Sequence, residues 1–283
     1  MARFDRLREI QALHPERDHA RIQHLSTGYE FPWDTVRALE IALYRTYCVP
    51  SISALLDRTG EFRQRTQQRY DDTALIVAEM CEWGYENGRG REALERMNFI
   101  HGHFKISNED YLYVLSTFVY EPIRWIDRFG WRKLCEQEKL AAYYFWREVG
   151  KRMGIKDIPP SYETFEHYNR NYEREHFRYA DSNKNVGSAT RDLFASWFPR
   201  LFAPLVRHGV YAMLEERMLV AFGFPRTFPF MPSLARFALK LRGQIVRFFP
   251  PRKKPHFFTD IPSRTYPHGY EISKLGPPRL QKA

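Results

Sequence analysis

The chain has 283 residues, of which 43% are hydrophobic and 28% are charged. This composition excludes a chain that is disordered throughout, and it supplies enough apolar side chains for one large domain or two small ones. The formal net charge of +10 is concentrated in the C-terminal third, because residues 199–283 hold 15 Lys and Arg but only 4 Asp and Glu.

The N-terminal segment is charged and contains no apolar stretch of the kind that defines a signal peptide. No part of the chain approaches the roughly 18–20 consecutive apolar residues that cross a membrane as a helix. The three cysteines, Cys48, Cys81 and Cys135, are far apart and form no C-x-x-C pair, which indicates reduced and mostly buried thiols. These features together predict a cytoplasmic protein.

Helical periodicity and helix-capping residues dominate the chain, and alternating runs of β-branched residues are nearly absent. Asp34 fits an N-cap, Ser107 followed by Asp110 resembles a capping box, Pro50 ends a helix, and Pro122 is expected to kink one. The sequence therefore predicts an all-α fold, a single globular multi-helix domain. The predicted helices cover residues 34–47, 61–84, 90–104, 107–130, 135–153, 161–177, 186–197, 202–222 and 233–248.

The C-terminal third combines its basic charge with many Phe, Leu and Pro residues. Two segments, 196–224 and 232–249, alternate apolar clusters with Arg and Lys. Such basic amphipathic stretches favour an anionic membrane surface, although two core-packing helices with a solvated basic face would give the same pattern. Residues 251–283 are rich in Pro and basic residues, so we expect an extended or partly disordered tail after a domain that spans 1–250. No nucleic-acid-binding module is visible.

Two of the predicted helices carry polar residues on their apolar faces. In 61–84, Arg69 and Thr73 are four residues apart and continue an apolar stripe, and in 90–104, His101 shares a face with apolar residues. A polar group turned toward a core costs about 1–3 kcal/mol when it has no hydrogen-bond partner. A buried cofactor is one economical partner for these side chains.

Three stretches, in this order and spacing, resemble the MpaB/latex-clearing-protein (rubber oxygenase) family: RYDDTALIVAEMCEWG, RMNFIHGHFKISNEDYLYVLSTFVYEPIRWIDRFGWRKL and YEREHFRYADSNKNVGSAT. The resemblance covers roughly residues 60–195. It implies a haem-binding helical fold, globin-like or bundle-like, with a b-type haem held through one helical histidine. It also implies dioxygen-dependent cleavage of a carbon–carbon double bond in an isoprenoid chain.

The resemblance makes His101 the candidate axial ligand of the haem iron, with His103 as the alternative. The two residues are two apart on a helix, so they point about 200° from one another and cannot both ligate one iron from the same face. His101 lies among apolar residues, which suits a haem ligand, and we therefore prefer it. Without the resemblance, a satisfied core histidine would be the simpler interpretation.

In the rubber oxygenases that the chain resembles, an Arg-x-x-Lys-Thr element precedes the ligand histidine. Arg69 and Thr73 match its arginine and threonine, and they are expected to be catalytic residues that also support the haem or the oxygen site. The lysine position holds Asp72, a departure that argues against cleavage of a long polymer. The alternative is a surface ion pair between Arg69 and Asp72 beside a solvated threonine. His176 is expected around the haem pocket or in a hydrogen bond between helices.

Two other functions stay open. The Glu-x-x-His motif occurs at Glu16–His19 and at Glu173–His176, and two such motifs with two further carboxylates build di-iron sites in helical oxygenases. The aromatic content of 16% also suits a non-catalytic protein that holds an isoprenoid or acyl chain. Motifs for nucleotide binding, hydride transfer and serine hydrolysis are absent from the sequence.

The sequence and the resemblance together predict a cytoplasmic, haem b-dependent oxygenase that can attach peripherally to a membrane. Its expected partners are dioxygen and a small hydrophobic substrate, an isoprenoid or unsaturated lipid, and no nucleic acid.

Overall fold

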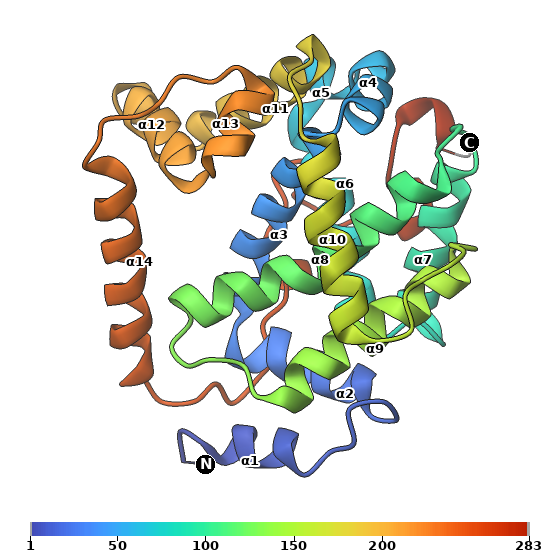
Figure 1. Ribbon diagram of the computed structural model, residues 1–283. Coiled ribbons are helices and arrows are strands. Elements are labelled where there is room, and N and C mark those ends of the chain that lie inside the picture. Colours follow the sequence, from blue (N-terminus) through green and yellow to red (C-terminus); the bar gives the residue numbers. More distant parts are fainter. Residues whose placement is uncertain (1, 282–283) are drawn as a thin grey trace.

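The computed structural model describes residues 2–281, and every regular element in that range is helical (Figure 1). The helices form one globular unit, which confirms the predicted all-α fold, and no strand is formed within 2–281. The α-helices are α1 (Asp5–Gln11), α2 (His19–His24), α3 (Pro32–Tyr47), α4 (Pro50–Thr59), α5 (Glu61–Gln64), α6 (Thr66–Trp83), α7 (Gly88–His101), α8 (Asn108–Phe129), α9 (Glu136–Arg152), α10 (Tyr162–His176), α11 (Asp181–Ser196), α12 (Ala203–Met213), α13 (Glu216–Phe222) and α14 (Met231–Arg247). A π-helical turn, η1 (Leu25–Glu30), follows α2, and the short 3-10 turns are η2 (Arg200–Phe202), η3 (Phe258–Asp260), η4 (Ile272–Lys274) and η5 (Pro278–Leu280).

Most of the predicted helices are confirmed to within a few residues at each end. Ser107 caps α8 by accepting a hydrogen bond from the Asp110 backbone N–H at 3.0 Å, which is one of the two bonds of the predicted capping box. The helix continues through Pro122 to Phe129 without interruption. The helix predicted over 61–84 is in fact two helices, α5 and α6, because Arg65 leaves the helical conformation between them.

The helix predicted to stop before Pro50 does end at Tyr47, ahead of that proline. Pro50 also begins α4, since proline lacks a backbone N–H and its fixed φ suits the first helical turn. The prediction for Asp34 is wrong. Asp34 is not an N-cap but a buried residue in the first turn of α3, where it pairs with Arg242 at 2.9 Å. The predicted helix 202–222 is also divided, into α12 and α13, at the extended backbone of Leu214.

The central core lies where α3 crosses α8 and α6 packs on α7, with α9 and α10 against them (Figure 1). Aromatic side chains fill much of it, and Tyr120, Phe145 and Phe165 are among the largest fully buried ones. A second apolar cluster joins α3 to α11, α12 and α13 around Tyr44 and Phe222. In the described range, no helix is long and apolar enough to cross a membrane.

The C-terminal tail is extended, as predicted, but it is an ordered part of the core and not a disordered appendage. Its Phe257, Ile272 and Leu275 are buried in the central cluster. The buried Arg96 of α7 donates from Nε to the Leu275 carbonyl at 2.7 Å. The tail therefore belongs physically to the helical unit, although a boundary at residue 250 stays a prediction.

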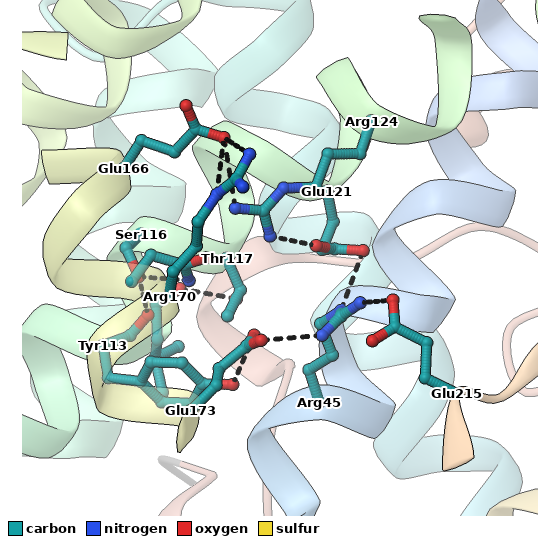
Figure 2. Close-up of polar contacts among 12 residues, drawn as sticks. Arg45, Tyr113, Ser116, Thr117, Glu121, Arg124, Glu166, Arg170, Glu173 and Glu215 are labelled. Carbon is teal, nitrogen blue, oxygen red and sulfur yellow. Dashed lines mark hydrogen bonds and ion pairs between the residues drawn. The ribbon is translucent and has the colours of Figure 1, made fainter. Parts of the chain in front are cut away.

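A buried ionic cluster fastens α3 to α8, α10 and the start of α13 (Figure 2). Arg45 lies with its Nε 2.9 Å from a Glu121 carboxylate oxygen as an ion pair, and it donates hydrogen bonds from Nη1 to Glu173 at 2.8 Å and from Nη2 to Glu215. Arg124 pairs with the other oxygen of Glu121 at 2.7 Å. Since α3 and α8 also line the cavity described next, this cluster fixes the spacing of two of its walls.

Candidate functional site

A large cavity lies among α3, α4, α6, α7, α8 and α11, and the tail closes part of it at Gly276 and Pro277. It encloses about 1800 Å³ that protein atoms do not occupy, its open mouth included. Its walls are mainly apolar, with side chains such as Met97, Ile100 and Phe118. A mainly apolar lining of this kind suits an apolar ligand.

His101 lines the cavity from the last residue of α7. Its Nδ1 atom is buried and has no hydrogen-bond partner, and its ring packs edge-on against Tyr111 with centroids 5.6 Å apart. Burial, together with the positive charge of Arg69, lowers the pKa of His101 to about 4. The imidazole is therefore neutral at pH 7, which is the form in which histidine ligates metal ions.

Arg69 and Thr73 line the same cavity from successive turns of α6. The Arg69 guanidinium donates from Nη1 to the Thr73 hydroxyl, which in turn donates to the Arg69 carbonyl at 2.9 Å. The structure thus brings Arg69, Thr73 and His101 to one cavity. Thr73 is half-buried against the cavity rather than solvated at the surface.

Asp72, which stands at the lysine position of the Arg-x-x-Lys-Thr element, is buried beside the cavity and lines it. The tail residue Tyr266 donates its hydroxyl to Asp72 Oδ1 at 2.5 Å. Burial raises the pKa of Asp72, while this hydrogen bond and the charge of Arg69 oppose the rise. The alternative of a surface ion pair between Arg69 and Asp72 is wrong, because the Asp72 carboxylate is buried and bonded to the tail.

The other two predicted histidines lie elsewhere. His103 is exposed, hydrogen-bonds through Nδ1 to the Phe99 carbonyl at 2.7 Å, and lies edge-on against the Phe99 ring. His176 ends α10, where its Nδ1 bonds the Tyr172 carbonyl at 3.0 Å and its ring stacks on Tyr172 with centroids 3.9 Å apart. Neither residue lines the cavity. The expected hydrogen bond of His176 between helices is instead made within its own helix.

The sequence reasoning missed a polar pair in the cavity wall, Glu40 and Tyr70. The Tyr70 hydroxyl donates to Glu40 Oε1 at 2.7 Å, and Arg37 pairs with the same oxygen at 2.8 Å. Burial raises the pKa of Glu40 to about 7, although Arg37 and the hydrogen bond from Tyr70 oppose the rise. The signal was present in the sequence, because Glu40 lies between Val36 and Leu43 on one helical face.

A second, smaller apolar cavity adjoins the first, and both are lined by Glu40, Tyr70 and Thr73. It extends toward Pro32 of α3 and Phe257 of the tail. The two spaces are therefore separated only by side chains of α3, α6 and α8. An elongated ligand in the main cavity would have apolar space on both sides of Thr73.

The residues of the two Glu-x-x-His motifs pair with other side chains and not with one another. Glu16 pairs with Arg147 at 3.2 Å and His19 hydrogen-bonds Tyr85, whereas Glu173 belongs to the Arg45 cluster. Within residues 2–281 there is no group of three or more His, Cys, Asp or Glu side chains placed to hold a metal ion. The ligand cluster that a di-iron centre requires is thus not assembled from these motifs.

Comparison with known proteins identifies the family. A family model described as "ER-bound oxygenase mpaB/B'/Rubber oxygenase, catalytic domain" matches residues 36–243. The ER-bound oxygenase mpaB of Penicillium roqueforti (strain FM164) is 30% identical over 229 residues, which cover 75% of this chain and 77% of that protein. The ER-bound oxygenase mpaB' of Penicillium brevicompactum is 28% identical over 264 residues (87% of this chain, 62% of that protein), and the mpaB of the same species is 35% identical over 164 residues (56% and 42%). The chain therefore belongs to the mpaB/rubber oxygenase family of oxygenases.

Proposed function

We propose that the protein is a haem b-dependent oxygenase that uses dioxygen to cleave or oxidise a carbon–carbon double bond of an isoprenoid or unsaturated lipid. One observation carries the proposal. Among the described residues that line the cavity, His101 alone has a buried polar side-chain atom without a hydrogen-bond partner. A neutral imidazole at the wall of an apolar cavity supports a role as the axial ligand of a haem iron.

The donor set of the cavity fits a haem. His101 would ligate the iron, while the cationic Arg69 and the hydroxyl of Thr73 would hold the propionates or the oxygen site. The apolar walls suit the porphyrin ring. The exposed His103 offers no such surroundings, which supports the choice of His101 as the ligand.

Haem bound in this cavity would supply the activation of dioxygen and the oxidation of the double bond. The chain itself would orient an apolar substrate along the main cavity and exclude water from it. Glu40 would exchange a proton at its carboxyl group, because a pKa of about 7 lets it both hold and release that proton near neutrality. Tyr70 and Arg37 would keep that carboxyl in place.

The cavity supports a small or medium substrate over a long polymer. Gly276 and Pro277 of the tail close part of the wall, and Asp72 replaces the lysine of the rubber oxygenases. The relatives are named ER-bound oxygenases, and an apolar substrate would itself be dissolved in lipid. We therefore propose that this chain, too, works at a membrane surface.

An absorption spectrum of the purified protein, before and after dithionite, tests the proposal. We expect a Soret band in the wild type that is lost in His101→Ala and retained in His103→Ala, which alters a neighbouring but exposed histidine. Added imidazole should restore the band in His101→Ala by occupying the vacated position. Loss of the band in His103→Ala alone would transfer the ligand role to His103. A colourless protein from haem-replete cells, with a lipid tightly retained, would instead support the non-catalytic lipid-binding function.

A further inference from the structure

We infer that α14 is a docking helix that lies in the surface of an anionic membrane with its outward apolar stripe among the lipids. The inference rests on the membrane part of the proposed function and does not depend on haem. In Figure 1, α14 stands at the edge of the molecule, apart from the central helices. It is an amphipathic helix, but its larger apolar stripe faces away from the protein.

The outward stripe follows helical periodicity. Its residues are four, three, four, four and three positions apart, which places them on one face at about 100° per residue. Phe237 is 64% exposed and Phe248 is 86% exposed. The described part of the chain provides no cover for these side chains. The stripe, all of it exposed, consists of Phe230, Leu234, Phe237, Leu241, Ile245 and Phe248.

The opposite face attaches α14 firmly to the core, so its orientation is defined. A Cβ on Gly243 would lie 2.6 Å from the Phe129 carbonyl oxygen, which shows how closely the two backbones approach. Arg242 pairs with the buried Asp34 at 2.9 Å and stacks over Trp33 at 3.7 Å. The apolar stripe is therefore held outward by contacts on the other side of the helix.

The charge along α14 matches an anionic surface. Between residues 228 and 254 there are seven Lys and Arg and no Asp or Glu. Arg236, Lys240 and Arg247 are exposed on one flank between the outward stripe and the inward face. Arg252, Lys253 and Lys254 are exposed directly after the helix. Apolar side chains inserted among acyl chains, with basic side chains beside them at the headgroups, are the arrangement of an interfacial helix.

A second copy of the chain fits this surface less well. Two α14 helices packed stripe to stripe would bring their basic flanks together with no acidic residue in either segment to offset the repulsion. Anionic lipid headgroups supply that missing negative charge. Each Lys or Arg near such a surface contributes attraction that disappears within a Debye length, so high salt should weaken the binding.

Sedimentation with vesicles of phosphatidylcholine, with or without phosphatidylserine, tests the inference. We expect the full-length protein to bind the anionic vesicles at least tenfold more tightly than the neutral ones. Phe237→Ser with Leu241→Ser should weaken binding to anionic vesicles at least tenfold. Lys253→Gln with Lys254→Gln should weaken it severalfold and reduce its salt dependence. Trp83→Ser, which alters an aromatic side chain that is 58% exposed on α6, is the matched control and should bind as the wild type does.

The circular dichroism and absorption spectra should be the same in all these variants, which separates docking from folding and from haem binding. If the Ser variants bind vesicles as the wild type does, α14 is not the docking face, even though membrane binding itself stands. If the wild type binds no vesicles, the membrane part of the proposed function fails as well. If it is instead a dimer that the Ser variants dissociate, the stripe is a protein–protein interface and the inference is wrong.

Discussion

Replacement of Arg45 by methionine should destabilise the whole fold. The change keeps the aliphatic stem but removes the charge that faces Glu121 and Glu173 in the interior (Figure 2). Removal of one partner from a buried ion pair costs roughly 3–5 kcal/mol, because the remaining charge is left uncompensated. The lower end applies here, since Arg124 still pairs with Glu121. Glu173 would keep only the hydroxyl of Tyr113, which donates to it at 3.2 Å.

The assay is thermal and urea unfolding at pH 7, followed by circular dichroism. For proteins of this size, about 1 kcal/mol shifts the melting temperature by roughly 2–4 °C, so we expect a decrease of about 6–12 °C. Arg170→Met is the matched control. Arg170 makes a similar bond to Glu166 at 2.7 Å, but its side chain is 66% exposed, and exposed pairs contribute about 0–1 kcal/mol.

The pH dependence provides a stricter test of the same reasoning. Burial already raises the pKa of Glu173 in the presence of Arg45, and removal of the arginine should raise it further. A carboxyl group whose folded-state pKa exceeds its unfolded value stabilises the fold as pH falls, because the folded state binds the proton more tightly. Burial would raise the pKa of Glu121, but the charges of Arg45 and Arg124 outweigh it and lower that pKa. The stability that ionised Glu121 gives the wild type is therefore lost only below the ordinary glutamate pKa of 4.5. The stability gap between wild type and Arg45→Met should therefore shrink from pH 7 to pH 5. A gap that stays constant, or that is under about 1 kcal/mol at pH 7, would refute the argument.

Two further substitutions test the tail and the helix crossing beside the cavity. Tyr266→Phe removes the donor to the buried Asp72 and should lower the free energy of unfolding in urea by about 1–3 kcal/mol at neutral pH. The loss should be smaller at acidic pH, because burial raises the pKa of Asp72 and the carboxyl group is then protonated. The exposed Tyr179→Phe, whose hydroxyl donates to Asp181, should change little, and equal effects of the two variants would contradict this account. Gly90→Ala should lower the melting temperature strongly, because its Cβ would lie 1.6 Å from the Gly84 carbonyl oxygen and force α6 and α7 apart, at a cost of about 1–3 kcal/mol or more. Gly209→Ala, in α12 with no heavy atom within 4 Å of the new Cβ, is its control, and a Gly90→Ala variant that melts as Gly209→Ala does would count against the close crossing.

The helices could be predicted because their signals are local. Apolar periodicity and the Ser107 cap depend only on neighbouring residues, and both describe α8 correctly. The start of α4 at Pro50 and the burial of Asp34 could not be predicted in this way. A proline that follows the end of one helix can also begin the next, and Asp34 pairs with Arg242, about two hundred residues along the chain.

The candidate site was predicted in part for the same reason. His101 and Arg69 could be placed on apolar faces from spacing alone, and the structure brings both to the cavity. Glu40 was missed although its helical position was visible, because only the fold shows that its face lines a cavity. His176 was expected around the haem pocket and lies in one of the stretches that match the family. It ends α10 and does not line the cavity. This could not be predicted, because a sequence pattern does not specify how far a helix end lies from a cavity.

The tail explains how α6 can be buried while it carries so many charged side chains. Tyr266 donates to Asp72, Thr265 donates to Asp71 at 2.5 Å, and Tyr270 donates to Glu79 at 2.6 Å. Partners within the chain therefore account for these acidic groups, and no cofactor is needed for them.

The expectation that buried polar residues on these helices require a cofactor therefore applies to fewer residues, because most of them have partners within the chain. Arg69 and Thr73 bond to one another, and the acidic residues of α6 bond to the tail. Around the cavity, within the described chain, His101 Nδ1 is the buried polar side-chain atom that the protein leaves without a partner. A buried group of this kind costs about 1–3 kcal/mol unless a ligand or another group pairs with it. The residue that bears this free-energy cost, His101, is also the described residue of the main cavity whose neutral ring can ligate a metal ion. For this reason His101→Ala is the decisive variant for the proposed activity.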